Sequence, residues 1–164
     1  MPAYPDQRSA IERLFEGDNP LLHELLDGMP YRSDAQLMVR AREIVEDLSN
    51  EQRVQLINLH PRIGDTSKRL KSEYPTSYAE QGADQDISQE GVLELLESLN
   101  KQYEARFGFR FVVFVNGRPK PDLIPILRHR LQRSRDEELE TALAEILAIT
   151  ADRLSKRPLI GQTR

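Results

Sequence analysis

A helix-starting pattern that recurs along the chain constrains the fold more than any other feature of the sequence. Three times a serine is followed, three residues later, by Gln or Glu and then by apolar residues at helical spacing. This is the capping-box pattern, in which both side chains accept hydrogen bonds from backbone N–H groups at the start of a helix. The pairs are Ser33 and Gln36, Ser49 and Gln52, and Ser134 and Glu137.

The apolar spacing between these starts predicts about eight helices. We expect them near residues 11–15, 20–26, 33–48, 49–60, from 77 onward, 88–107, 122–131 and 134–154, with Asp122 as the cap of the seventh. A chain of 164 residues suits one domain with a single core. The prediction is therefore an all-α, single-domain bundle over residues 1–164, in which 155–164 form a loose tail.

One segment interrupts the helical pattern. Residues 111–115 are aromatic or β-branched without a helical stripe, which is typical of extended, buried chain. Asn116-Gly117 would suit a hairpin turn, but Pro119 and Pro121 leave the following residues poorly able to pair as a return strand. We therefore predict a lone extended segment. Its function could be that of core alone, or its unpaired backbone groups could bind a polar ligand.

His60 precedes Pro61, and proline disfavours helical geometry in the residue before it, so the fourth helix should end near His60. An imidazole in the last turn of a helix lies at the negative end of the helix dipole, which favours the protonated form by about 0.3 to 1 kcal/mol. His60 is thus placed to donate a proton. The alternative is a helix-ending histidine with a solvated ring.

Hydrogen-bonding side chains follow His60 across a polar loop, in the stretch Ser77-Tyr78-Ala79-Glu80-Gln81. Glu80 can accept hydrogen bonds, and Gln81 can both donate and accept them. Ser77 and Glu80 also have the capping-box spacing, so a helix start is the alternative interpretation. Arg118 and Arg130 are open to the interpretation of ordinary surface arginines.

Several classes of protein are disfavoured by composition. The chain has no cysteine and hence no thiol nucleophile or thiolate metal site, and its three histidines lie far apart, so we predict neither a metal nor a cofactor. The net charge of −4 argues against nucleic-acid binding. No apolar run is long enough for a membrane span and the N-terminus lacks a signal pattern, so the expected location is cytoplasmic.

The chain resembles the 2-oxo-4-hydroxy-4-carboxy-5-ureidoimidazoline (OHCU) decarboxylases of uric acid degradation. The matching motifs fall in the same order over most of the chain from about Phe15 onward, and they are specific only in combination. They are His60-Pro61, Ser77-x-x-Glu80-Gln81, Leu99-Asn100-x-x-Tyr103, Arg106-Phe107-Gly108-Phe109-x-Phe111-Val112, Arg130-Leu131 and the final Arg153-Leu154.

The resemblance implies an all-helical fold, a homodimer, and a cofactor-independent loss of carbon dioxide from OHCU that yields (S)-allantoin. It assigns His60 as the proton donor, and Glu80 is the second residue predicted to be catalytic. The substrate-binding residues that it implies are Pro61, Ser77, Tyr78, Ala79, Glu80, Gln81, Phe111, Val112, Val113, Phe114, Val115 and Arg130. A competing hypothesis is a non-catalytic relative that kept the helical scaffold and binds a small molecule or a protein partner.

Overall fold

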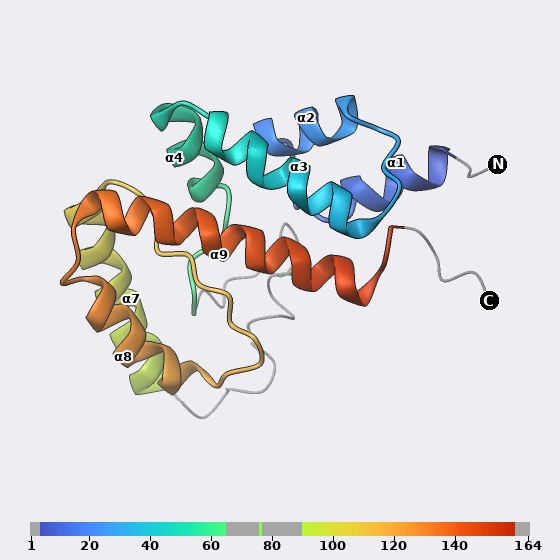
Figure 1. Cartoon of the computed structure of the whole chain (residues 1–164). Helices are drawn as coiled ribbons and strands as arrows, with labels where there is room; N and C mark the ends of the chain where they lie inside the picture. The colour runs from blue at the N-terminus through green and yellow to red at the C-terminus, as the bar shows by residue number, and fades with distance from the viewer. Residues whose placement is uncertain (1–3, 65–75, 77–89, 160–164) are drawn as a thin grey trace.

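The computed structural model of the chain describes residues 4–64, 76 and 90–159. Within these ranges the regular elements of the chain are helices, as predicted (Figure 1). Their bounds are α1 Tyr4–Glu12, α2 Pro20–Asp27, α3 Asp34–Asp47, α4 Asn50–Asn58, α7 Glu90–Phe107, α8 Lys120–Arg130 and α9 Arg135–Lys156.

The predicted helix caps are confirmed at the starts of α4 and α9. Ser49 and Ser134 each accept the backbone N–H of the residue three positions on, and that residue's side chain accepts the serine N–H in return. Ser33 accepts the N–H of Gln36 at the start of α3 in the same way, while the Gln36 side chain accepts from Arg32. These bonds satisfy N–H groups that a helix start leaves without an intrahelical partner.

The start of α8 differs from the prediction. The residue at the cap position is Pro119, and Asp122 lies inside the first turn instead of capping the helix. Pro121 explains the earlier start, because its ring fixes a helical φ angle and its missing N–H is not needed in the first turn.

The long helix α9 runs through the middle of the fold (Figure 1). It packs against α3 and α4, while α7 and α8 pack against each other. The inward stripe of α9 includes Leu139, Ala142 and Ile146, all of which are buried. Burial of such a stripe, at roughly 25 cal/mol per Å² of apolar surface, is the main stabilising contribution.

The C-terminal end of α9 extends further than predicted. The helix continues to Lys156, and beyond it the side chain of Leu159 is buried. The Leu159 N–H donates to Oδ1 of Asp34 at the start of α3 (3.0 Å). The described part of the predicted tail is therefore docked, because it has an apolar anchor and a side-chain acceptor for its backbone.

Between α7 and α8 the chain runs as an extended segment below α9 (Figure 1). No residue of this segment is assigned to a strand, as the sequence predicted. Asn116 and Gly117 form the turn, with φ angles of 51° and 72°. The Arg118 N–H closes it on the Val115 carbonyl (3.0 Å). The turn has the backbone of a hairpin without a partner strand.

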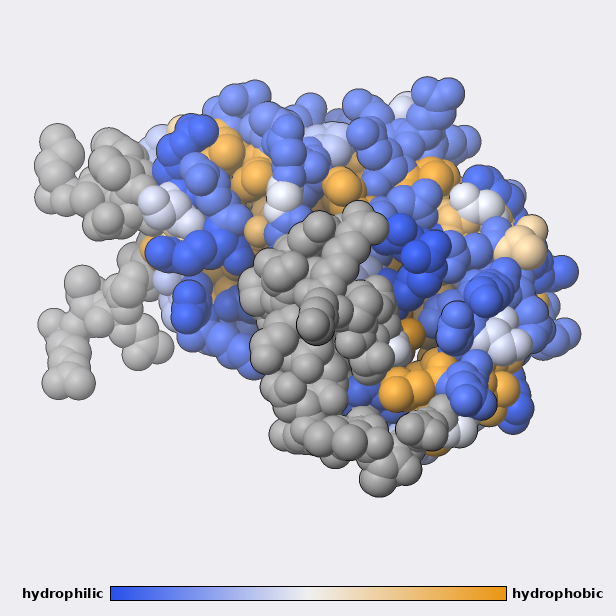
Figure 2. Space-filling model, turned by 180° about the vertical axis from the view of Figure 1, so that it is seen from behind, coloured by the Kyte–Doolittle hydropathy of each residue, from blue (hydrophilic) through white to orange (hydrophobic). Residues whose placement is uncertain are grey.

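The outer surface is mainly polar. On the face shown in Figure 2, hydrophilic side chains dominate outside the grey atoms, with apolar atoms in separate places. Among the described residues, Val39 is the only large apolar residue that is exposed. Each described helix is too short or too polar to cross a lipid bilayer.

Candidate active site

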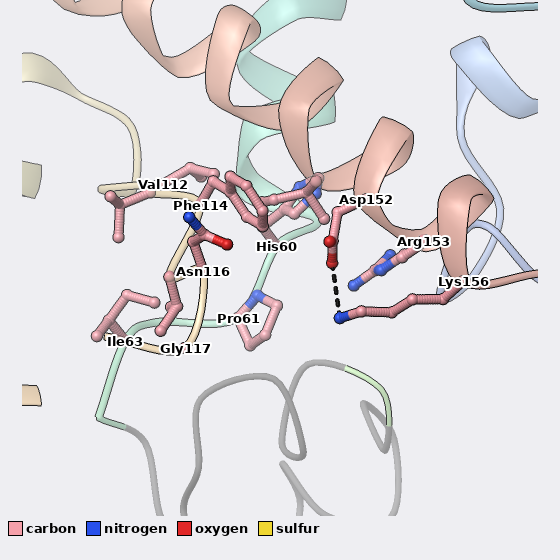
Figure 3. Close-up of a pocket in the computed structure, with 13 residues that line it drawn as sticks. His60, Pro61, Ile63, Val112, Phe114, Asn116, Gly117, Asp152, Arg153 and Lys156 are labelled. Carbon is pink, nitrogen blue, oxygen red and sulfur yellow. Dashed lines mark hydrogen bonds and ion pairs between the residues drawn. The ribbon is translucent and has the colours of Figure 1, made fainter. Parts of the chain in front are cut away.

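A cavity of about 260 Å³ lies where three separate stretches of the chain meet (Figure 3). They are the chain just after α4, the extended segment, and the last turns of α9. The volume is somewhat below the roughly 300 to 1,000 Å³ of sites for drug-sized ligands, so the cavity suits a small metabolite. Its lining consists of His60, Pro61, Ile63, Val112, Val113, Phe114, Val115, Asn116, Gly117, Ile149, Asp152, Arg153 and Lys156.

Hydrogen bonds of its ring and of its backbone hold His60 at this cavity. The helix α4 ends at Asn58, and the His60 N–H still donates to the Ile57 carbonyl (3.1 Å). Ring atom Nδ1 lies 3.3 Å from the Leu56 carbonyl. A carbonyl can only accept, so Nδ1 carries the proton and Nε2 keeps its lone pair in the neutral ring. Arg110 Nη1 donates to the His60 carbonyl (3.0 Å).

The environment of His60 favours the neutral imidazole. Burial, and after it the nearby positive charge of Arg153, lowers the pKa of His60 from 6.5 to about 4. The hydrogen bond to Leu56 and the charge of Glu16 act in the opposite direction without outweighing them. The sequence suggested the charged form because it revealed only the helix end. Desolvation of a charged ring outweighs a dipole effect of about 0.3 to 1 kcal/mol.

Three charged residues on α9 form the polar wall of the cavity. Arg153 is tethered through Nη1 to the carbonyl of Leu14, in the N-terminal part of the chain (2.8 Å). Lys156 Nζ lies 2.9 Å from Asp152 Oδ2. With His60 neutral, the described lining carries two positive charges and one negative charge. The cavity therefore favours an anionic ligand.

A buried ion-pair network supports the extended segment from behind. Arg130 Nη1 donates to the Val112 carbonyl (2.6 Å), and its Nε donates to Glu138 (2.7 Å). The Tyr103 hydroxyl donates to the same Glu138 oxygen (2.5 Å). Burial and this hydrogen bond raise the pKa of Tyr103. The guanidinium of Arg130 also lies 4.6 Å from the centre of the Phe111 ring.

Arg118 holds the far end of the same segment. Its Nε donates to the Val115 carbonyl (2.9 Å), and its Nη2 donates to the Phe114 carbonyl. Carbonyl groups that an extended segment would otherwise leave without donor partners are thereby satisfied. The interpretation of Arg130 as an ordinary surface arginine is wrong, because its side chain is buried and binds the Val112 carbonyl. Arg118 is half-buried and binds backbone carbonyls at the other end of the segment.

The predicted site residues fall into three groups. His60, Pro61 and the run Val112, Val113, Phe114 and Val115 come together at the cavity. Phe111 and Arg130 lie in the core behind it. Ser77, Tyr78, Ala79, Glu80 and Gln81 lie outside the residues that the structure describes, so their proximity to His60 stays a prediction.

The charged wall of α9 was not among the predicted site residues. Asp152, Arg153 and Lys156 stand three, four and seven residues after Ile149, and thus continue the inward stripe of the helix. The sequence does contain a signal for them: the face of α9 that is apolar along most of the helix carries charged residues in its last two turns. Among the described residues, no group of three or more His, Asp or Glu side chains is placed to hold a metal ion.

Comparison with known proteins identifies the family of the chain. Residues 3–155 match the family model described as OHCU decarboxylase. The chain belongs to the OHCU decarboxylase family. The family predicted from the motifs around His60 and Arg106 is thereby confirmed.

Individual proteins that are similar in sequence support the same family assignment. It is 32% identical over 149 residues to a 2-oxo-4-hydroxy-4-carboxy-5-ureidoimidazoline decarboxylase of Haloferax volcanii, covering 90% of this chain and 86% of the relative. It is 33% identical to a uric acid degradation bifunctional protein of Bacillus subtilis, covering 77% of this chain but 25% of that longer protein.

Solved structures show the same fold. An OHCU decarboxylase crystallised in the presence of (S)-allantoin superposes with a TM-score of 0.64 at 23% identity, covering 83% of this chain and 88% of the other. An (S)-allantoin synthase superposes with a TM-score of 0.63 at 22% identity, covering 91% of this chain and 49% of the other. The predicted all-α architecture is confirmed by both.

Proposed function

We propose that this protein decarboxylates OHCU to (S)-allantoin in uric acid degradation, without a cofactor. The observation that carries the proposal is the position of His60, a group that can move a proton, in a small cavity beside Arg153 and Lys156. Such a cavity suits an anion of metabolite size. Family membership supplies the identity of that anion.

Loss of carbon dioxide leaves an electron pair on the ring carbon that carried the carboxylate. The neighbouring ring imine can take up this pair, which removes the need for an organic electron sink. One proton must then be added, since R–COO⁻ and H⁺ give R–H and CO₂. Delivery of that proton by a positioned side chain is typically worth about 10² to 10⁴ in rate.

His60 is neutral in the environment described above, so it needs a proton before it can donate one. A substrate carboxylate bound near Nε2 favours uptake of this proton by His60, because an opposite charge within about 4 to 6 Å raises the pKa of an imidazole. The substrate thereby helps to load the donor. When carbon dioxide leaves, the carboxylate charge is gone from that position, and the imidazolium gives its proton to the ring carbon.

The remaining assignments extend this proposal. Glu80 accepts hydrogen bonds from the ureido N–H groups, and Gln81 both donates to and accepts from the ring amides. Backbone groups between Val112 and Val115 complete the contacts. Arg130 acts as a positioning residue, because its hydrogen bond holds the Val112 carbonyl at the cavity.

A homodimer in the cytoplasm is part of the same proposal. The assembly is tested by analytical ultracentrifugation of the purified chain, which should give twice the monomer mass. A monomer at assay concentration would contradict it.

The decarboxylase assay uses freshly generated OHCU and follows optically active allantoin by circular dichroism. Wild type should yield the (S) form. The spontaneous reaction gives a racemate, so optically active product indicates catalysis. His60→Asn should lower kcat by about 10² or more, the usual contribution of a proton-transferring group. Glu80→Gln should lower kcat/KM, because it replaces a charged acceptor of the ureido N–H groups by a neutral one.

The matched control is His129→Asn, since His129 is exposed on α8, and it should keep the wild-type rate. Equal rates for wild type, His60→Asn and Glu80→Gln would reject the assigned roles. Only racemic product from wild type would instead support the non-catalytic alternative.

A further inference from the structure

The last turn of α9 adds a second cation to the cavity beside Arg153. Lys156 lines the cavity and pairs with Asp152, one turn earlier on the same helix (Figure 3). The Lys156 side chain is 66% exposed and that of Asp152 is 20% exposed. The lysine therefore occupies the solvent side of the pair, where an entering ligand can reach it.

This pair is unusual for its position. An anion-binding cavity has no electrostatic need for a carboxylate, and Asp152 opposes the entry of any anion. Its pairing with Lys156 offsets that charge and orients the ammonium group toward the cavity. A ligand carboxylate can then compete with Asp152 for Lys156, since a partly exposed ion pair has modest strength.

The proposed reaction changes the charge of its ligand. The substrate enters with an ionised carboxylate, and the allantoin that leaves is neutral, because the carboxylate departs as CO₂ and a proton takes its place. A site that binds only the ureido and ring groups would hold both molecules almost equally. Discrimination between them needs a group that responds to the lost charge.

We propose that Lys156 is a specificity-determining residue that makes the cavity prefer the anionic substrate over the neutral product, with Asp152 as its counter-ion before the ligand binds. The inference rests on the proposed function, which supplies the charge difference. Lys156 thus favours substrate capture and product release, and it plays no part in proton transfer.

The kinetic signature follows from the charge balance. The total negative charge of the ligand is the same in the bound substrate and in the decarboxylation transition state, so an exposed cation attracts both about equally. Removal of such uniform binding raises KM and leaves kcat unchanged. Lys156→Gln should therefore raise KM by about two- to fivefold, the range of one partly exposed charge pair.

Salt distinguishes this electrostatic role from a packing role. The Debye length falls from about 30 Å at 0.01 M to about 3 Å at 1 M salt. The rise in KM caused by Lys156→Gln should be largest at about 0.01 M salt and largely absent at about 1 M salt. Asp152→Asn should shift KM in the opposite direction at low salt, because it removes the opposing charge.

The matched control is Lys101→Gln. Lys101 pairs with Glu97 at the same helical spacing on α7, at 3.4 Å, and is 76% exposed. It does not line the cavity described above. This variant should keep the wild-type KM at every salt concentration.

A binding experiment separates this inference from the proposed function. Calorimetry with allantoate, an anion that carries the same ureido group, and with neutral allantoin should give a preference for allantoate that Lys156→Gln reduces by about two- to fivefold. Equal affinities of wild type and Lys156→Gln for allantoate, or no binding of allantoate to wild type, would overturn the inference. Absence of turnover by wild type, with the allantoate preference intact, would overturn only the proposed function.

Discussion

Substitution of Glu138 by Gln is expected to destabilise this protein far more than its small change in shape suggests. Glu138 is fully buried and accepts hydrogen bonds from Arg130, Arg133 and Tyr103, at 2.7, 3.0 and 2.5 Å. Arg130 is 4% exposed, so water cannot replace the lost carboxylate. Glu138→Gln keeps the size of the side chain and leaves a buried guanidinium without its counter-charge.

Breaking a buried ion pair on one side costs about 3 to 5 kcal/mol. Folded domains have a total stability of only about 5 to 15 kcal/mol. The substitution should therefore remove a large fraction of the free energy of unfolding. For a chain of this size it should lower Tm by about 6 to 20 °C, since each kcal/mol corresponds to roughly 2 to 4 °C.

Urea unfolding followed by far-UV circular dichroism measures this loss. The matched control is Glu140→Gln, on the same helix, whose carboxylate pairs with Arg53 and is 72% exposed. Exposed pairs contribute about 0 to 1 kcal/mol, so this variant should unfold almost like wild type. Equal midpoints for Glu138→Gln and Glu140→Gln would refute the reasoning.

A double variant tests whether the cost comes from the unpaired charge. Arg130→Met combined with Glu138→Leu removes both members of the pair, and such replacements are often neutral or stabilising. It should be more stable than Glu138→Gln alone. Its kcat should still be low, because the Val112 carbonyl loses the hydrogen bond that holds it at the cavity.

Two further predictions concern His60. The pKa of His60 is about 4 in the folded protein and 6.5 in the unfolded chain, so the folded protein binds fewer protons between these pH values. The free energy of unfolding should therefore fall by about 3 kcal/mol as the pH drops from 6.5 through 4. Urea unfolding of His60→Asn should lack this component, and parallel pH profiles for His60→Asn and wild type would contradict the prediction. Arg110→Gln removes the donor to the His60 carbonyl and should lower kcat by up to about 10² through misplacement of the ring. Arg106→Gln, which removes a similar bond to a carbonyl remote from the cavity, should not, and equal kcat values for the two variants would count against a positioning role.

The sequence by itself determined the helical architecture. Capping boxes at Ser49 and Ser134 act within four residues, and apolar stripes such as that of α9 act within one helix, so both can be recognised without knowing the fold. The lone extended segment was equally predictable, because residues 111–115 and the prolines that follow impose their preferences locally. The position of His60 beside Pro61 identified a candidate proton carrier for the same reason.

Only the tertiary structure decided which side chains share the cavity and how His60 is protonated. Arg153 lies far from His60 in sequence, yet its charge and the burial of the ring lower the pKa of His60, opposite to the effect of the helix end alone. Arg130, open to interpretation as a surface residue, became a buried support once Glu138 and the Val112 carbonyl were packed around it. Burial and charge pairing depend on distances between remote segments, and local sequence patterns do not contain those distances.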